Sequence, residues 1–252
     1  MFKELIRSMV DLTVLLTVSV AKDVNTSRHL KIGNGWVGSL TIYDNDELNP
    51  TCGCKKCISS YNPSTKYADI VIYTTTDVVQ NDKEAKSTTC RLFYNDSNSE
   101  MTIIEDVNEE CEISVEQKKC KLTFVTCNNE IIEKLNDASL KWFERYTKVN
   151  KRHYKNRDEH KAVIIVSHIH GLHKRISIGK WIDRKEHISS EYGKITRYIY
   201  NTPTCSGSAG AYVYIVSRDK KGWLSQHFHH GVIRNEYKFC GVGTDYGAKE
   251  RK

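Results

Sequence analysis

The residues best suited to chemistry lie in the segment Cys205–Ala211, whose sequence is CSGSAGA. Gly207 and Gly210 allow the chain to turn sharply, and apolar residues then recur at the strand period of two. A tight turn of this kind can aim successive backbone N–H groups at one oxygen atom and stabilise negative charge on it. Ala209 lies in the middle of the turn and has no atom that could attack a carbonyl group. The segment predicts either an oxygen-binding turn without a nucleophile or an ordinary Gly/Ser connection.

Three cysteines in a C-x-C-x-x-C arrangement form a second candidate for chemistry. Cys52, Cys54 and Cys57 lie in a loop rich in Asn, Pro and Ser. Three thiolates this close could hold zinc if a fourth ligand came from another part of the chain. No second cysteine pair has the spacing of a zinc ribbon, so small-residue packing in the loop is the simpler interpretation and no metal or cofactor is expected.

Histidines cluster twice in the second half of the chain. In H-I-H-G-L-H, His168 and His170 would share one face of a strand and could in principle ligate a metal with the three cysteines. His229 and His230 belong to a later cluster, HFHH. Buried or solvated imidazoles without a ligand are the alternative for both clusters. Cys205 precedes Ala209 by four residues, and we expect it to pack in the core.

The elements that must position these residues are mostly strands. Strand-like segments in the first half are followed by one helical segment, Glu130–Val149, and then by a basic stretch that ends near Lys161. A short helix is also expected at Phe2–Met9. The expected strands are Leu12–Ala21, Ile32–Tyr43, Ala68–Thr76, Thr89–Tyr94, Met101–Ile104, Glu112–Val115, Lys121–Thr126, Ala162–Ser167, Arg175–Trp181, Lys194–Tyr200, Ala211–Ser217 and Gly231–Tyr237.

Two runs of short strands joined by a helix predict an all-β protein of two antiparallel barrels. The expected division is an N-terminal barrel at 1–128, a helix and basic linker at 129–161, and a C-terminal barrel at 162–252 that carries the glycine turn. At 252 residues the chain is long enough for this arrangement.

Composition restricts the class of protein further. The apolar fraction of 39% and the charged fraction of 27% are those of a globular protein. The net charge of +7 comes from scattered residues, so neither nucleic acid nor a membrane is an expected partner. The apolar run Leu12–Val20 is too short to span a bilayer, and no secretory signal is recognisable. We therefore expect a cytoplasmic protein whose nine cysteines are free thiols.

Landmarks along most of the chain resemble those of trypsin-like serine peptidases of the chymotrypsin fold, nearest to invertebrate peptidase-like domains. The landmarks occur in the family's order, and they are Val10-Asp11-Leu12-Thr13-Val14, Gly35-Trp36-Val37, Tyr73–Val79, Leu122–Thr126, Val166–Gly171 and Thr204–Val213. The resemblance implies two barrels with a substrate cleft between them.

The resemblance also implies a catalytic triad whose three positions are all replaced. The family's histidine position matches Asp77, its aspartate position matches Asn128, and its serine position matches Ala209. A serine hydroxyl needs an adjacent imidazole to remove its proton and a carboxylate to orient that imidazole. Residues 30–150 contain no histidine, so a shift of alignment that makes Ser208 the nucleophile still leaves the first half without a base.

The sequence therefore predicts a catalytically inactive serine peptidase homologue that binds proteins or extended peptides. The N–H groups of Gly207 and Ala209 would form an oxyanion-hole-like nest, and the cleft would include Pro203, Thr204, His229 and His230. Two alternatives remain: an active peptidase with an unorthodox site built from Asp77, Ser208 and His230, and a zinc- or redox-responsive protein that uses its cysteines and histidines.

Overall fold

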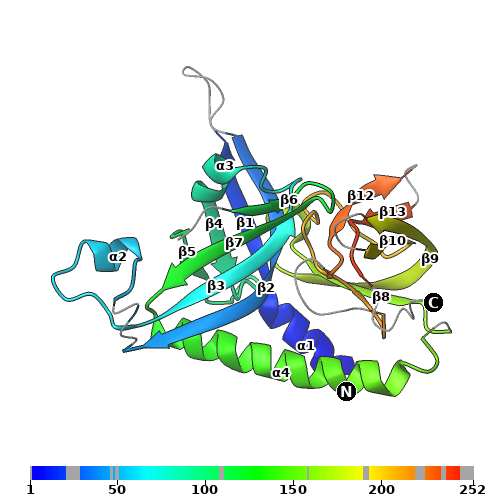
Figure 1. Ribbon diagram of the computed structural model, residues 1–252, viewed down its shortest axis with the longest axis horizontal. Helices are drawn as coiled ribbons and strands as arrows, with labels where there is room; N and C mark the ends of the chain where they lie inside the picture. Colours follow the sequence, from blue (N-terminus) through cyan, green and yellow to red (C-terminus); the bar gives the residue numbers. More distant parts are fainter. Residues whose placement is uncertain are drawn as a thin grey trace.

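The two halves of the chain form two antiparallel sheets that pack side by side above two helices (Figure 1). This computed structural model describes residues 2–20, 29–45, 48, 51–107, 111–157, 159–189, 193–218, 225–233 and 237–244. No helix in these ranges is both long and apolar enough to cross a membrane.

The first sheet has seven strands in the order β5-β4-β1-β2-β3-β7-β6, and every neighbouring pair is antiparallel. Its ends approach each other, because the Val125 N–H donates to the Asp106 carbonyl at 3.0 Å and Val107 forms a bridge to Phe124. The strands are β1 (Thr13–Val20), β2 (His29–Asp44), β3 (Lys66–Thr75), β4 (Thr88–Leu92), β5 (Thr102–Ile104), β6 (Glu112–Ser114) and β7 (Lys119–Thr126).

The second sheet has six strands in the order β11-β8-β9-β10-β13-β12. Its ends also meet, since the His229 N–H donates to the Ala211 carbonyl and the Val213 N–H to the His227 carbonyl, both at 2.8 Å. The strands are β8 (Ala162–Ser167), β9 (Arg175–Ser189), β10 (Gly193–Tyr200), β11 (Val213–Ile215), β12 (His229–Ile233) and β13 (Tyr237–Cys240).

The helix α4 (Asn129–His153) forms where apolar residues recur at helical intervals, and it lies beside α1 (Phe2–Leu12). The Asn128 side chain begins it by accepting hydrogen bonds from the N–H groups of Glu130 and Ile131 at 3.0 and 3.3 Å. Three short helical turns complete the structure: α2 (Lys55–Ile58), α3 (Asp82–Lys86) and η1 (Ile169–Gly171).

The main core crosses from one sheet to the other. Trp142 of α4 contacts Trp36 of β2 at 5.0 Å between ring centroids, and it contacts Tyr212 and Tyr214 at 5.8 Å. Residues of β1, β2, β3, β7, β8 and α4 belong to this one buried cluster. The site between the sheets therefore rests on a continuous apolar support.

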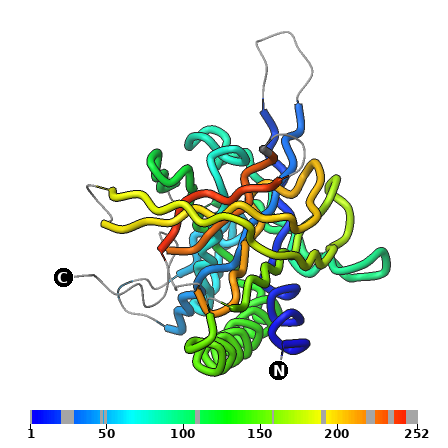
Figure 2. Tube along the Cα trace, turned by 90° about the vertical axis from the view of Figure 1, so that its right-hand side faces the viewer, coloured from blue at the N-terminus to red at the C-terminus, as the bar shows by residue number. Residues whose placement is uncertain are grey.

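The expected elements are present with bounds that differ by a few residues, and three of them differ more from the sequence-based prediction. The strand expected at Arg175–Trp181 continues to Ser189, because β9 pairs with β10 along a long hairpin (Figure 2, yellow). The side chains of β9 are largely exposed, whereas half of those of β10 are buried. The strand expected at Gly231–Tyr237 is two strands, β12 and β13, which pair with each other. The helix α4 includes part of the basic stretch that we expected to be linker.

Candidate functional site

The glycine turn before β11 has the backbone conformation that its sequence predicts. Gly207 and Gly210 have φ angles of +88° and +78°, in the left-handed region that favours glycine. A Cβ atom on Gly210 would lie 2.2 Å from the Asn34 carbonyl oxygen and 2.4 Å from the Thr74 hydroxyl oxygen. Only glycine fits at this position, so the turn is fixed against the first sheet.

Asn34 of β2 holds the turn in place, and sequence analysis missed this residue. Its fully buried amide Nδ2 donates to the carbonyls of Gly207 at 2.7 Å and Ala209 at 3.3 Å. Its Oδ1 accepts from the His168 N–H at 2.7 Å, and its own N–H donates to the Ala209 carbonyl at 2.8 Å. One side chain therefore connects the first sheet, the turn and the end of β8. The only signal in the sequence was a polar residue between two glycines in an apolar strand.

A pocket of about 500 Å³ opens over the turn, between Thr204–Ala209 and the β12 strand. Among the predicted cleft residues, Thr204, His229 and His230 line it, and the exposed Pro203 lies just outside. Gly207 and Ala209 also line it, and no acceptor in the described part of the chain takes a hydrogen bond from their N–H groups. These two N–H groups are thus available to an oxygen atom of a ligand.

Asp77 lies beside His230, so the imidazole that is missing from the first half reaches this position from the second half. The Asp77 Oδ2 and the His230 Nδ1 are 2.6 Å apart. The hydrogen bond from His230 lowers the pKa of the Asp77 carboxyl group below its ordinary value. The other ring nitrogen of His230 is buried and has no hydrogen-bond partner among the described residues, and it lies 2.6 Å from the place where a Cβ of Gly241 would lie. The imidazole is therefore not directed at the turn.

Two further histidines are buried in the neutral form. His168 stacks on Tyr94, its Nδ1 lies 2.7 Å from the Leu172 carbonyl, and burial lowers its pKa to about 4. His229 is hydrogen-bonded to the Tyr200 hydroxyl at 2.7 Å, and burial lowers its pKa to about 3. Neither residue can carry charge at neutral pH.

We expect the free energy of unfolding to fall as the pH is lowered from 6.5 to 4. The pKa values of His168 and His229 are lower in the folded chain, so the unfolded chain binds more protons in this range. At about 1.4 kcal/mol per pKa unit, the two histidines together account for a loss of several kcal/mol. Urea unfolding at several pH values measures this slope, which His168→Gln should reduce and the exposed control His187→Gln should not. An unchanged slope in His168→Gln would contradict the assignment.

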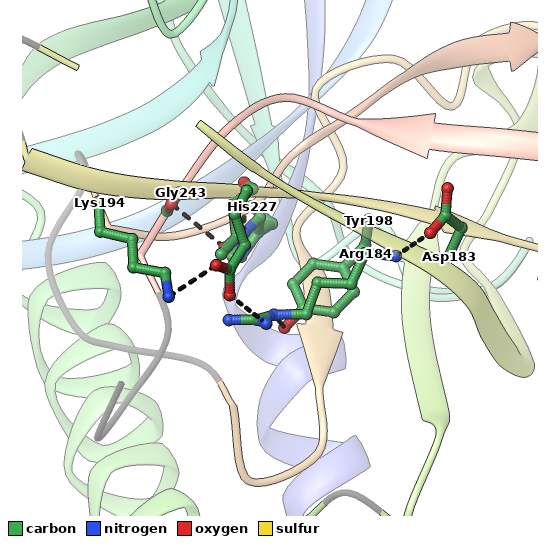
Figure 3. Close-up of polar contacts among 8 residues, drawn as sticks. Asp183, Arg184, Lys194, Tyr198, His227 and Gly243 are labelled. Carbon is green, nitrogen blue, oxygen red and sulfur yellow. Dashed lines mark hydrogen bonds and ion pairs between the residues drawn. The ribbon is translucent and has the colours of Figure 1, made fainter. Parts of the chain in front are cut away.

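His227, from the same cluster as His229, lies outside the pocket. It is fully buried under the β9–β10 hairpin, where its Nε2 is 3.1 Å from the Thr196 hydroxyl (Figure 3). Nearby on the hairpin, Arg184 donates to the Tyr198 hydroxyl at 3.1 Å. This network supports the second sheet and takes no part in the pocket.

Ser208 does not face the pocket. Its side chain is fully buried, with the hydroxyl oxygen 3.3 Å from that of Ser167 and at 3.4 Å from the Cys205 N–H. The alternative site that combined Asp77, Ser208 and His230 is therefore not assembled. The alternation of the turn directs Ser208 inward, and its neighbour Ala209 lies at the pocket.

Asn128 is not brought to Asp77. The β3–β7 register places Thr126 opposite Ala68 and Lys119 opposite Thr75, so the two ends of this strand pair are seven residues apart, or roughly 23 Å. Asn128 follows the far end and caps α4, whereas Asp77 follows the near end. Lys118, which precedes β7, lies at the same end of the strand pair as Asp77, and its carbonyl accepts a hydrogen bond from the Thr76 N–H at 3.1 Å.

Cys205 is exposed and contacts a histidine, contrary to the expectation that it packs in the core. Its Sγ is 3.2 Å from the Nε2 of His170. His170 has a φ angle of +55°, and its N–H donates to the Ser206 carbonyl at 2.8 Å. The turn η1 thus packs against the glycine turn and places the His170 imidazole beside Cys205, the only exposed thiol among the nine cysteines.

The three clustered cysteines are joined by a fourth, Cys127, at the end of β7. The four Sγ atoms lie within 4.8 Å of one another. The predicted histidine ligands do not join them, because His168 and His170 lie against the glycine turn. Cys127 is 70 residues from Cys57 in the sequence, so the spacing of the cysteines could not show that it joins the cluster.

Comparisons with known proteins give a fold-level likeness only. No family model and no curated protein matches the chain. Among solved structures, it is similar to the active form of the Rv3671c protease from M. tuberculosis, with 10% identity and a TM-score of 0.46, covering 94% of this chain and 78% of that one. Deg5 has the same identity and score, with 94% and 87% covered. A variant of the HtrA-type protease AlgW with a tripeptide has 7% identity and a TM-score of 0.48, with 95% and 59% covered.

The Rv3671c and AlgW structures are named as proteases. At such identities and scores the likeness says nothing about activity or substrate. The chain itself has two antiparallel sheets with a glycine turn between them, an architecture consistent with that of trypsin-like serine peptidases.

Proposed function

We propose that this protein is a catalytically inactive homologue of trypsin-like serine peptidases that binds extended peptide segments of other proteins. The observation that carries the proposal is the glycine turn itself. Its backbone is formed and two of its N–H groups are available, but the side chain at its centre is the methyl group of Ala209. A peptide carbonyl or carboxylate can be held there, while no atom at that position can attack it.

The hydrogen bonds that join the two ends of each sheet support a two-barrel arrangement. We retain the division into an N-terminal barrel at 1–128, a helix and linker at 129–161, and a C-terminal barrel at 162–252. In this arrangement the pocket lies on the second barrel, and Asp77 of the first barrel contacts His230, which lines the pocket.

The acid–base groups near the pocket do not suit peptide hydrolysis. Asp77 occupies the position where the family has its base, and its pKa is lowered by the hydrogen bond from His230. A carboxylate that is a weaker base than usual would remove a proton from a hydroxyl group or water poorly at neutral pH. Loss of one triad member alone costs roughly 10⁴-fold in turnover.

The geometry of β12 suits peptide binding. The strand begins at His229, which is hydrogen-bonded to Ala211 at the other end of the sheet. Within the part of the chain that the structure describes, Gly231 and Val232 pair only with β13, which leaves an edge there, and both line the pocket. An extended peptide can add to such an edge through main-chain hydrogen bonds. Lys238, opposite Val232 on β13, also lines the pocket and would attract a peptide carboxylate held by the Gly207 and Ala209 N–H groups.

We expect binding without cleavage when the protein is incubated with a proteome-derived peptide library. Mass spectrometry should find no new peptide termini, and a fluorophosphonate probe should label a trypsin control but not this protein. Peptides retained on the immobilised protein should bind in solution by fluorescence anisotropy. Lys238→Glu should weaken the binding of retained peptides that have a free C-terminal carboxylate about tenfold, or by about 1.4 kcal/mol. The exposed control Lys185→Glu should leave their binding unchanged.

Equal binding of the retained peptides to both lysine variants would contradict the placement of the ligand in the pocket. Labelling by the fluorophosphonate probe that disappears in Ser208→Ala would contradict the inactive assignment, because the buried hydroxyl would then be the nucleophile.

A second candidate function rests on the contact between Cys205 and His170. At 3.2 Å from the Sγ atom, the imidazole can take the thiol proton, and the resulting thiolate could attack a peptide carbonyl at the edge of the pocket. The C–N bond would then break, the amine would leave with the proton from the imidazolium, and water would hydrolyse the thioester that remains on Cys205. The same incubation distinguishes this candidate. New termini that are absent with Cys205→Ser would establish a thiol hydrolase in place of a binding module.

A further inference from the structure

The four clustered cysteines come from two distant parts of the first sheet. Cys52, Cys54 and Cys57 lie in and beside α2, in the connection between β2 and β3, and Cys127 follows β7. The first three side chains are buried, with exposed fractions of 3%, 4% and 5%, and Cys127 is half-buried. The fold therefore brings four thiols together in a protected place at one end of the sheet.

The distances between the sulfur atoms are those of a tetrahedral metal site. Zinc–thiolate bonds of about 2.3 Å place the sulfurs of a Cys₄ site about 3.8 Å apart. The Sγ atoms of Cys54 and Cys127 are 3.8 Å apart, and those of Cys57 and Cys127 are 3.6 Å apart. All six separations are at most 4.8 Å. A small inward movement of the side chains would complete the tetrahedron.

Backbone N–H groups point at two of the sulfur atoms. The Cys54 N–H donates to the Sγ of Cys52 at 3.4 Å, and the Ser64 N–H donates to the Sγ of Cys57 at 3.5 Å. Hydrogen bonds of this kind orient the ligands of metal sites and stabilise thiolates. A similar bond from the Tyr198 N–H to the Sγ of Cys240 at 3.3 Å lies outside the cluster, so these bonds are compatible with a metal site but do not require one.

A neighbouring pocket of about 620 Å³ reaches the cluster, and Cys54 and Cys127 contribute to its lining. Two basic and two acidic residues also line it, namely Lys55, Lys56, Glu105 and Asp106, and Lys55 pairs with Asp106 at 3.4 Å. The pocket gives a solvent path by which a metal ion can reach the sulfurs.

Disulfide bonds do not account for the cluster. All nine cysteines are free in the structure, and a disulfide would need a sulfur separation of about 2.05 Å. The tight grouping of four sulfurs, with Cys127 close to two others, also fits a shared central ion better than two separate pairs.

We propose that Cys52, Cys54, Cys57 and Cys127 bind one zinc ion in a closed, structural Cys₄ site. The zinc joins the β2–β3 connection to the end of β7, next to the residue that caps α4. This connection has few apolar anchors of its own, since Ile58 and Tyr61 are largely exposed. The metal supplies a cross-link that the β2–β3 connection otherwise lacks.

Metal analysis of the full-length protein, purified under reducing conditions without chelator, tests the site. We expect one zinc per chain, and below about 0.1 per chain in Cys57→Ser and Cys127→Ser, because a ligand has been removed. The matched control Cys205→Ser, which changes an exposed thiol outside the cluster, should keep one zinc.

A spectroscopic measurement keeps the test decisive if the ligand variants fail to fold. The metal-free wild-type protein is titrated with Co²⁺, which should give thiolate-to-metal charge-transfer absorption and the strong d–d bands of tetrahedral coordination, saturating at one equivalent. Absence of these bands would overturn the proposal, as would zinc content that is unchanged in Cys57→Ser or a disulfide among the four cysteines in the purified protein. None of these readouts depends on peptide binding.

Discussion

Replacing Asn34 with alanine is expected to lower the free energy of unfolding by about 3 kcal/mol or more. The variant removes the donor to the Gly207 and Ala209 carbonyls and leaves the buried His168 N–H without its acceptor. A buried polar group without a partner costs about 1–3 kcal/mol, which exceeds the net value of the hydrogen bond itself. Urea or thermal unfolding measures the loss, and the midpoint should fall by roughly 6–12 °C for a chain of this length.

The same variant should also weaken peptide binding, because Asn34 fixes the turn whose N–H groups the ligand uses. Asn34→Asp keeps the acceptor for His168 but directs a carboxylate oxygen at two carbonyls, so it should be at least as destabilising at pH 7. The exposed control Asn98→Ala should change stability by less than about 0.5 kcal/mol. If Asn34→Ala were as stable as this control, the turn would not depend on the first sheet.

Replacing Trp142 with alanine is expected to cost about 3–5 kcal/mol of unfolding free energy. The indole is 92% buried, at 8% exposure, and it contacts Trp36 of the first sheet and Tyr212 and Tyr214 of the second. Its removal leaves a cavity where the helix α4 supports both sheets. Chemical denaturation followed by circular dichroism measures the effect.

Leu140 provides a matched control on the same helix, since its side chain is 63% exposed. Leu140→Ala should change the unfolding free energy by less than about 0.5 kcal/mol. A separate unfolding transition for each half in Trp142→Ala would show that the helix couples the two sheets. A single transition at the wild-type midpoint would contradict its role.

The local pattern of the sequence predicts most of the secondary structure. Alternating apolar residues locate β3, β7, β8 and β10, and helical spacing locates α4. The prediction fails where strand length is set by a partner, as in β9, which continues to Ser189 because β10 pairs with it. Sequence periodicity could not show this, since the side chains of β9 are mostly exposed and mix polar and apolar residues.

The residues of the site were predicted in part. The glycine turn, Ala209 at its centre, and the pocket residues His229 and His230 follow from the sequence landmarks. Asn128, which was matched to the family's aspartate position, follows the end of β7 that is remote from Asp77. A match of short sequence landmarks cannot show this distance, because it leaves the strand register undetermined. Cys205 was expected in the core, since nothing nearby in sequence showed that His170 would face it.

Residue types and their spacing are enough to predict a mainly β chain, a glycine turn, and a segment of residues 30–150 that contains no imidazole. Which groups meet depends on the tertiary structure. His230 reaches Asp77 across 153 residues, Asn34 reaches Gly207 across 173, and Cys127 completes the thiol cluster. The physical reason is that periodicity and turn propensity act over a few residues, whereas these contacts depend on strand register and on how the two sheets pack.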